Sequence, residues 1–244
     1  MKNNTFLKMN QDQTIQPINT KAIIVGMVLL FIALQLGFHP TYIKHFPAFK
    51  PFTWLHHVHG ALMASWIILL VVQPILIHKG KYKVHRFMGK LSYLIAPLMI
   101  VSMYLILRFT YHKHVMDVSP EAEISNQGPI IMQLFGFTVL YALGVIYRKH
   151  TFYHLRFMIG TAILMIIPIL GRIFFEYFGA TVWYDLYLSV GIAFFLTIND
   201  ARKKQDWRPY AIVTAVLCSI LLVYFIRNTE AWLAVGRFVV HTFY

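Results

Sequence analysis

The sequence predicts an all-α protein: a polytopic integral membrane bundle of about seven transmembrane helices, with its amino terminus inside the cell and its carboxyl terminus outside. Apolar segments of about 17 to 25 residues recur along the chain of 244 residues, which is the length that an α-helix needs to cross a bilayer. Hydrophobic residues make up 58% of the chain and charged residues 13%, and the mean hydropathy is +0.60. These values lie far from those of globular domains and indicate a membrane protein.

Seven spans are predicted, each long enough to cross the hydrocarbon core. They cover residues 22–38, 53–77, 87–111, 128–147, 157–178, 182–198 and 209–226. The only acidic connection, 112–127, is predicted as a loop on the outer side. The chain thus divides into a cytoplasmic tail (1–21), a seven-helix transmembrane domain (22–227) and an amphipathic outer tail (228–244). No small-residue cleavage site follows the first span, so it is predicted to be a retained helix.

The net charge of +13 follows a topological pattern. Lysine and arginine gather in three connections predicted to face the cytoplasm, HKGKYKVHR, RKHTFYHLR and NDARKKQDWR. On that side they are opposed only by Asp12, Asp200 and Asp206. This asymmetry is the one that the positive-inside rule describes for a bacterial cytoplasmic (inner) membrane protein. We therefore expect the lipid bilayer, and no nucleic acid, as the partner of the basic residues. The single cysteine, Cys218, can form no internal disulfide.

The hairpin formed by the second and third spans carries an unusual polar stripe. His59, Trp66 and Gln73 are seven residues apart, which places them on one face of a helix whose other residues are apolar. An imidazole, an indole and a carboxamide are costly in lipid, so this face is predicted to pack against other helices.

Two predicted parallel spans begin with similar sequences. His85 opens HRFMG before a helix with a proline at 97, and His154 opens HLRFMIG before a helix with a proline at 168. A duplicated unit of two spans would explain the likeness, and so would the frequent use of basic residues and proline in short membrane helices.

The same two openings predict a cofactor site. Two imidazoles at one depth on separate helices are suitable axial ligands for a b-type haem. The guanidinium groups of Arg86 and Arg156 would bind the propionates, and Gly89 and Gly160 would leave room for the flat ring. Alternatively, the two histidines are interfacial residues that bind loops or lipid phosphates.

A second candidate site lies at the outer end. His59 shares a face with His56, and together with His112 or His114 it could bind zinc or iron, with a carboxylate from Glu176 or Asp185. No HExxH motif supports a specific metalloenzyme. In the fifth span, Arg172 precedes Glu176 by one turn, and a local ion pair is the favoured interpretation of these two charges, with a pathway residue as the second.

The pattern His59, Trp66, Gln73, Gly80, His85-Arg86 and Gly89 resembles a broad group of uncharacterised multi-spanning bacterial membrane proteins that share H-x6-W-x6-Q-x6-G-x4-H-R-x-x-G. The resemblance covers about residues 56–100 and implies a membrane fold. A further, architectural resemblance to transmembrane cytochromes b rests on parallel helices with histidines at matching depth, and only one haem has a histidine pair here.

Three functional hypotheses follow. The first is an inner-membrane protein that binds one b-type haem for redox chemistry or cofactor handling, with a membrane redox partner or a quinone. The second is a metal-dependent intramembrane enzyme that uses the outer histidines and activates water. The third is a transporter or assembly factor without catalytic activity, whose histidines carry protons or hold helices together. The sequence leaves open whether the protein is an enzyme.

Overall fold

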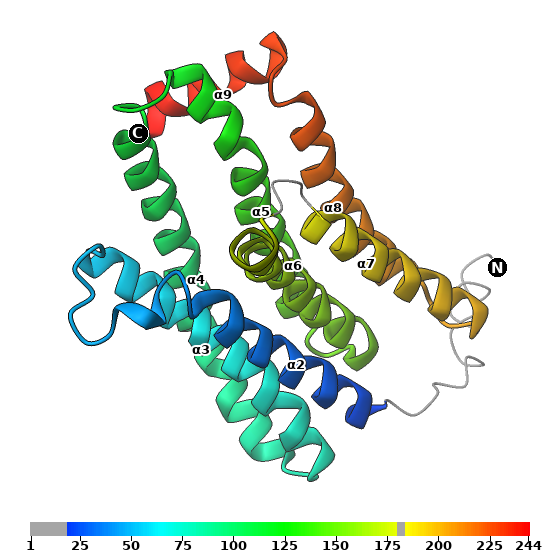
Figure 1. Cartoon of the computed structure of the whole chain (residues 1–244). Coiled ribbons are helices and arrows are strands. Elements are labelled where there is room, and N and C mark those ends of the chain that lie inside the picture. The colour runs from blue at the N-terminus through cyan, green and yellow to red at the C-terminus, as the bar shows by residue number, and fades with distance from the viewer. Residues whose placement is uncertain (1–18, 180–183) are drawn as a thin grey trace, which may run out of the picture.

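A computed structural model describes residues 19–179 and 184–244, and within these ranges it contains eight α-helices, one 3-10 turn and no strand (Figure 1). The elements are α2 (Thr20–Phe38), η1 (Ile43–His45), α3 (Trp54–His78), α4 (Tyr82–His114), α5 (Pro120–Ile146), α6 (Thr151–Phe178), α7 (Tyr184–Arg202), α8 (Arg208–Ile226) and α9 (Glu230–Phe243).

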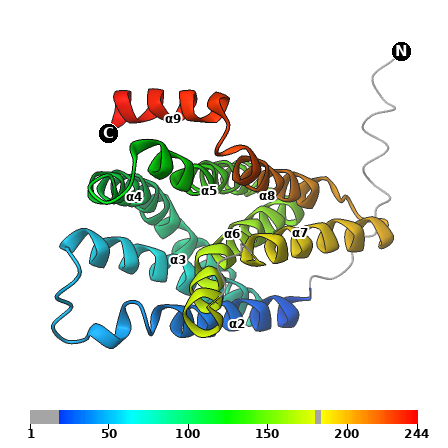
Figure 2. The ribbon, with the colours of Figure 1, turned by 45° about the horizontal axis from the view of Figure 1, so that its top comes forward.

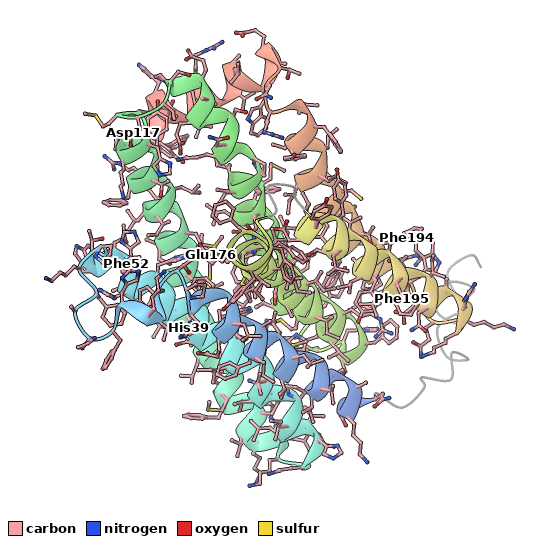
Figure 3. All side chains as sticks on the ribbon, in the orientation of Figure 1. His39, Phe52, Asp117, Glu176, Phe194 and Phe195 are labelled. Carbon is pink, nitrogen blue, oxygen red and sulfur yellow. The ribbon has the colours of Figure 1, made fainter. Side chains whose placement is uncertain are left out.

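Six of these helices are long and apolar enough to span a membrane, namely α2, α3, α4, α5, α6 and α8. The chain is therefore a multi-pass helical membrane protein. The predicted sixth span, 182–198, begins in residues outside the described ranges. Its described part, α7, is not among these six helices, because Asp185, Asn199 and Asp200 lower its apolar character. α7 nevertheless packs against α6 and α8. Phe194 and Phe195 project from its outer side (Figure 3).

The helix α6 lies at the centre of the bundle. It packs against α2, α5, α7 and α8, while α3 and α4 form a long hairpin beside it. α9 runs across the ends of α4 and α5 and packs against α5 (Figure 2). The predicted amphipathic tail is thus a helix.

The predicted acidic loop 112–127 is wrong in its second half. α5 begins at Pro120, because the Ser119 side chain accepts a hydrogen bond from the Ala122 amide and proline suits the first helical position. Glu121 and Glu123 lie in the first turn, where the helix dipole stabilises carboxylates. The extra two turns carry polar side chains into the bundle.

Trp66 marks the centre of the core. Its side chain is 1% exposed, and its ring contacts those of Phe137 and Tyr141 on α5 at centroid distances of 5.3 and 5.5 Å. The prediction that the Trp66 face of α3 is turned toward protein is confirmed. Its edge-to-face ring contacts are a favourable aromatic arrangement.

The two ends of the bundle differ in their residues, and we call them the chamber end, after the cavity described below, and the basic end. The chamber end holds the α2–α3 and α4–α5 connections, the end of α6 and the start of α7. The basic end holds the α3–α4, α5–α6 and α7–α8 connections, where the lysines and arginines concentrate.

Candidate functional site

A cavity of about 570 Å³ opens at the chamber end between α3, α4, α5, α6 and α7; we call it the chamber. A volume of this size accommodates a small-molecule ligand. Most of its wall is apolar, and polar side chains come from all five helices. The ionisable and amide groups in the wall are His59, His114, Glu123, Asn126, Gln127, Gln133, Arg172, Glu176 and Asp185. Glu176 lies near the end of α6 (Figure 3).

A proline in α6 explains one of the buried polar groups of the chamber. Pro168 has no amide hydrogen, so the carbonyl of Leu164 loses its helical partner. The Gln133 side chain of α5 donates a hydrogen bond to this carbonyl at 2.9 Å. Pro168 and Gln133 both line the chamber, and the proline therefore brings a buried amide to this position.

Arg172 is the cation of the chamber. Its Nη1 donates to the carbonyl of Pro168 at 2.8 Å, and its guanidinium lies over the ring of Phe38 at 4.3 Å from the centroid. None of the four ion pairs among the described residues includes Arg172. The expected ion pair with Glu176 is therefore not formed, although the two charges interact at longer range. Among the described residues the guanidinium has one hydrogen-bond acceptor, the carbonyl of Pro168, so most of its five N–H groups remain available to a ligand.

His59 of α3 meets Ser102 of α4, with 3.1 Å between Nδ1 and the hydroxyl oxygen. The Ser102 hydroxyl donates its only hydrogen to the carbonyl of Met99 at 2.8 Å. His59 Nδ1 must then be the donor in the first contact, so a neutral imidazole keeps its lone pair on Nε2. The chamber wall thus offers an acceptor nitrogen on the α3 side.

Asp185 reaches the chamber from the first turn of α7. It is 5% exposed, and its Oδ2 lies 3.0 Å from the position that a Cβ on Gly171 would occupy. Gly171 therefore allows the carboxylate to approach α6 closely. The start of α7 stabilises this negative charge, because free amide groups and the helix dipole meet there.

The α5 wall is a hydrogen-bonded chain. Glu123, 2% exposed, accepts from Gln127 Nε2 at 2.8 Å and lies 3.2 Å from Nδ1 of His114. The Gln127 oxygen accepts in turn from the hydroxyl of Tyr244, just after α9, at 3.0 Å. Burial, with smaller contributions from the nearby Tyr104 and Glu123, raises the pKa of Tyr244 to about 12. These groups satisfy one another and form a rigid wall.

The four histidines predicted as metal ligands do not gather. His56 bonds Thr53 at the start of α3, and His112 contacts the carbonyl of Tyr244. His114 contacts Glu123 and His59 contacts Ser102. Across residues 19–179 and 184–244, no group of three or more His, Cys, Asp or Glu side chains is placed to hold a metal ion.

At the basic end, His85 of α4 and His154 of α6 are close enough to interact electrostatically, without a hydrogen bond between them. Nδ1 of His154 is 2.8 Å from the carbonyl of Gly144, which makes it the donor and leaves Nε2 as the free nitrogen. The buried Nδ1 of His85 has no partner among the described residues.

The groups expected around a haem have other contacts. Arg156 donates to Asp200 at 2.6 Å, to Gln205 at 3.0 Å and to the carbonyl of Phe152 at 3.2 Å. A Cβ on Gly160 would lie 2.6 Å from Val213, so this glycine serves helix packing. Arg156 and Gly160 are therefore engaged in packing and hydrogen bonding and are not free for the role that the haem prediction gave them.

The other two residues of that prediction belong to the α3–α4 hairpin, Arg86 on its surface and Gly89 between its two helices. Arg86 lines a groove beside the turn between the two helices. Gly89 faces Gln73, whose Nε2 lies 3.5 Å from the position of an added Cβ and donates to the carbonyl of His85 at 3.3 Å. Gln73 therefore acts as a bridge within the hairpin.

Several groups of the chamber were absent from the predicted sites. The sequence analysis assigns no site role to Gln127, Gln133 or Ser102. Each is a polar side chain among apolar residues of a membrane helix, and such a residue usually faces protein or a cavity. This pattern identifies candidates, but it does not say that they face one cavity.

Comparison of the chain with protein-family models, with curated proteins and with solved structures finds no match. Fold and site together define the chain as a multi-pass membrane protein with a polar chamber at one end of its helical bundle.

Proposed function

We propose that this chain is a membrane protein of the transporter class, without catalytic activity, that binds a small anionic molecule in the chamber. The observation that carries the proposal is Arg172: a guanidinium inside a cavity of about 570 Å³, without an ion pair among the described residues. A cation in a membrane span is costly, and such residues mark substrate pathways or ligand sites.

The wall also holds three carboxylates, Glu123, Glu176 and Asp185, so an anionic ligand is expected at Arg172 itself. Glu123 already accepts a hydrogen bond from Gln127, and Asp185 lies at a helix start. Arg172, by contrast, uses only one hydrogen bond within the described residues. Its planar guanidinium can bind a carboxylate or a phosphate through two parallel hydrogen bonds. The apolar remainder of the wall would surround the uncharged part of the ligand.

Anion-dependent stability of the purified protein tests this proposal. Acetate, succinate, citrate and inorganic phosphate would be added separately to detergent-solubilised protein while its thermal unfolding is followed. At least one anion should raise the unfolding temperature, since a ligand at about 100 times its Kd adds about 2.7 kcal/mol. The effect should disappear in Arg172→Gln.

The matched control is Arg108→Gln, which removes an exposed arginine from α4 that does not line the chamber. It should respond like the unmodified protein. An equal response of Arg172→Gln and Arg108→Gln, or no response to any of the four anions, contradicts the proposal.

A second proposal concerns haem b between His85 and His154, and it rests on the orientation of His154. Its Nδ1 is held by the carbonyl of Gly144, which presents Nε2 as a ligand nitrogen. A bound haem would supply one-electron transfer to a membrane redox partner or quinone. A Soret band should appear after haem supplementation, survive His150→Ala and vanish in His85→Ala and His154→Ala. Protein without a Soret band ends this proposal.

We also propose that α7 makes a seventh crossing and that the basic end faces the cytoplasm of a bacterium. The basic connections and the exposed Phe194 and Phe195 support this topology. In a Cys218→Ala background, an impermeant maleimide should label Ser119→Cys on intact cells and Lys204→Cys only after lysis. Labelling of both on intact cells would mean that α7 does not cross, and the reverse pattern would invert the orientation.

A further inference from the structure

A second depression of the surface lies at the basic end, beside the turn that joins α3 to α4. This groove has a volume of about 470 Å³ and is lined by Gly80, Lys81, Tyr82, Lys83, Val84 and Arg86. Three of its six residues are cationic and none is acidic. None of the three forms an ion pair among the described residues. The groove therefore offers concentrated, unneutralised positive charge.

The groove lies beside the turn that joins α3 to α4, and both helices are apolar enough to span the membrane. The groove is therefore expected at the level of the lipid headgroups. Gly80 makes the short turn possible, because its φ of +66° lies in the left-handed region that side chains disfavour. Tyr82 is exposed beside the cations, as aromatic residues commonly are at the membrane interface.

An exposed apolar stripe leads from the groove along α4. Its members follow one another at intervals of three and four residues, which keeps them on one face of the helix. They are Val84, Phe87, Leu91, Leu94, Leu98 and Val101. From Val84 to Leu94 the stripe runs about 15 Å, half of the hydrocarbon thickness. Phe87 and Leu94 are its most exposed side chains, at 67% and 63%.

We propose that the groove binds the phosphate of one anionic phospholipid, whose acyl chain lies along this stripe of α4. The cations recognise phosphate oxygens, and a free phosphate would share this chemistry. The stripe commits the site to a lipid, because only a lipid places an apolar chain directly beneath its phosphate. This site is separate from the chamber and does not depend on the proposed ligand there.

Lipid binding by native mass spectrometry tests the proposal. The protein in neutral detergent would be titrated with dioleoyl phosphatidylglycerol, and in parallel with dioleoyl phosphatidylcholine, which has the same chains without net charge. Phosphatidylglycerol should bind at least tenfold more tightly. The triple variant Lys81→Gln, Lys83→Gln, Arg86→Gln should lose about 100-fold in affinity for it, since each cation contributes about fivefold.

The matched control removes three exposed cations from the α7–α8 connection at the same end: Arg202→Gln, Lys203→Gln, Lys204→Gln. Its affinity should stay within about threefold of the unmodified protein. Should the first triple variant fail to fold, Lys83→Gln and Lys203→Gln replace the two sets, with about a fivefold loss and none expected, respectively.

Three results would overturn the proposal. Equal affinity for the two lipids would show that charge is not recognised. An equal loss in both triple variants would show that only the net charge of this end matters. Displacement of phosphatidylglycerol by equimolar inorganic phosphate would show a phosphate site that makes no use of the stripe.

Discussion

Two arginines on α6 lie at opposite ends of the bundle and have opposite surroundings. At the basic end, the Arg156 guanidinium donates to Asp200, Gln205 and a backbone carbonyl, and it lies over the ring of Phe152. At the chamber end, Arg172 donates to one carbonyl and faces a cavity. The same residue type is saturated in one place and largely unsatisfied in the other.

Under the proposed function, this difference separates a structural cation, Arg156, from a ligand-binding one, Arg172. Arg156 and Asp200 are both buried, and each removes the cost of burying the other. Arg172 has no ion pair among the described residues, and the proposed function assigns its charge to a ligand in the chamber. The contrast also explains why the sequence suggested a cofactor role for Arg156: its buried partner Asp200 lies 44 residues away in the chain.

The largest effect should come from breaking the saturated pair. Arg156→Met leaves Asp200 buried and unpaired, and we expect a loss of about 3–5 kcal/mol in the free energy of unfolding. Denaturation of the detergent-solubilised protein by sodium dodecyl sulfate measures it.

The double variant Arg156→Met, Asp200→Leu serves as the control for this experiment, because it removes both charges together. It should recover most of the lost stability. A loss below about 1 kcal/mol in Arg156→Met would show that the pair is not the stabilising feature of the basic end.

A smaller effect should come from replacing Gly160. The result distinguishes a basic end in which Gly160 packs against α8 from one in which it leaves room for a haem ring. The added Cβ of Gly160→Ala meets Val213 at 2.6 Å, and we expect a loss of about 1–3 kcal/mol. Gly26→Ala is the matched helical control, since no atom lies within 4 Å of its added Cβ. It should be neutral or stabilise by up to about 1 kcal/mol. Equal effects in the same denaturation assay would contradict the close packing.

A still smaller effect, of opposite sign, is expected for Arg172→Met. Without ligand, the variant no longer buries an unpaired charge, and its free energy of unfolding should rise by about 1 kcal/mol or remain unchanged. A loss like that of Arg156→Met would mean that Arg172 has a structural partner and would remove the contrast between the two ends.

The smallest effect concerns the α5 wall of the chamber. The pKa of Tyr244 is raised to about 12, above its ordinary value near 10, so the neutral phenol is favoured in the folded state. Its stabilising contribution should be complete below pH 10 and lost as the pH rises toward 12. Unfolding temperatures of the unmodified protein and Tyr244→Phe should therefore converge over this range. A difference that is independent of pH would contradict the role of the hydroxyl.

Much of the fold could be predicted because it depends on local properties of the chain. The length and apolar composition of 53–77 correspond closely to α3, and the six long apolar helices were all anticipated. The boundary at Ser119 and Pro120 was missed although both residues favour a helix start. Acidic residues were taken as a loop signal, whereas near a helix start they are stabilised by the dipole.

The sites were harder to predict, because they join residues from several helices. The sequence indicated polar groups at two depths, and it paired Arg172 with Glu176 by their spacing alone. The structure instead places Arg172 over the ring of Phe38 of α2, in a chamber that Gln133 of α5 also lines. Spacing along one helix does not specify which neighbour lies opposite.

The helical membrane fold follows from the apolar segments of the chain, because backbone groups must be satisfied within each span wherever water is absent. The basic character of one end follows from the lysines and arginines in alternate connections. Which buried charges meet a partner depends on the packing of the helices, since packing sets the neighbours of each helix face. This packing gives Arg156 an aspartate and leaves Arg172 facing the chamber.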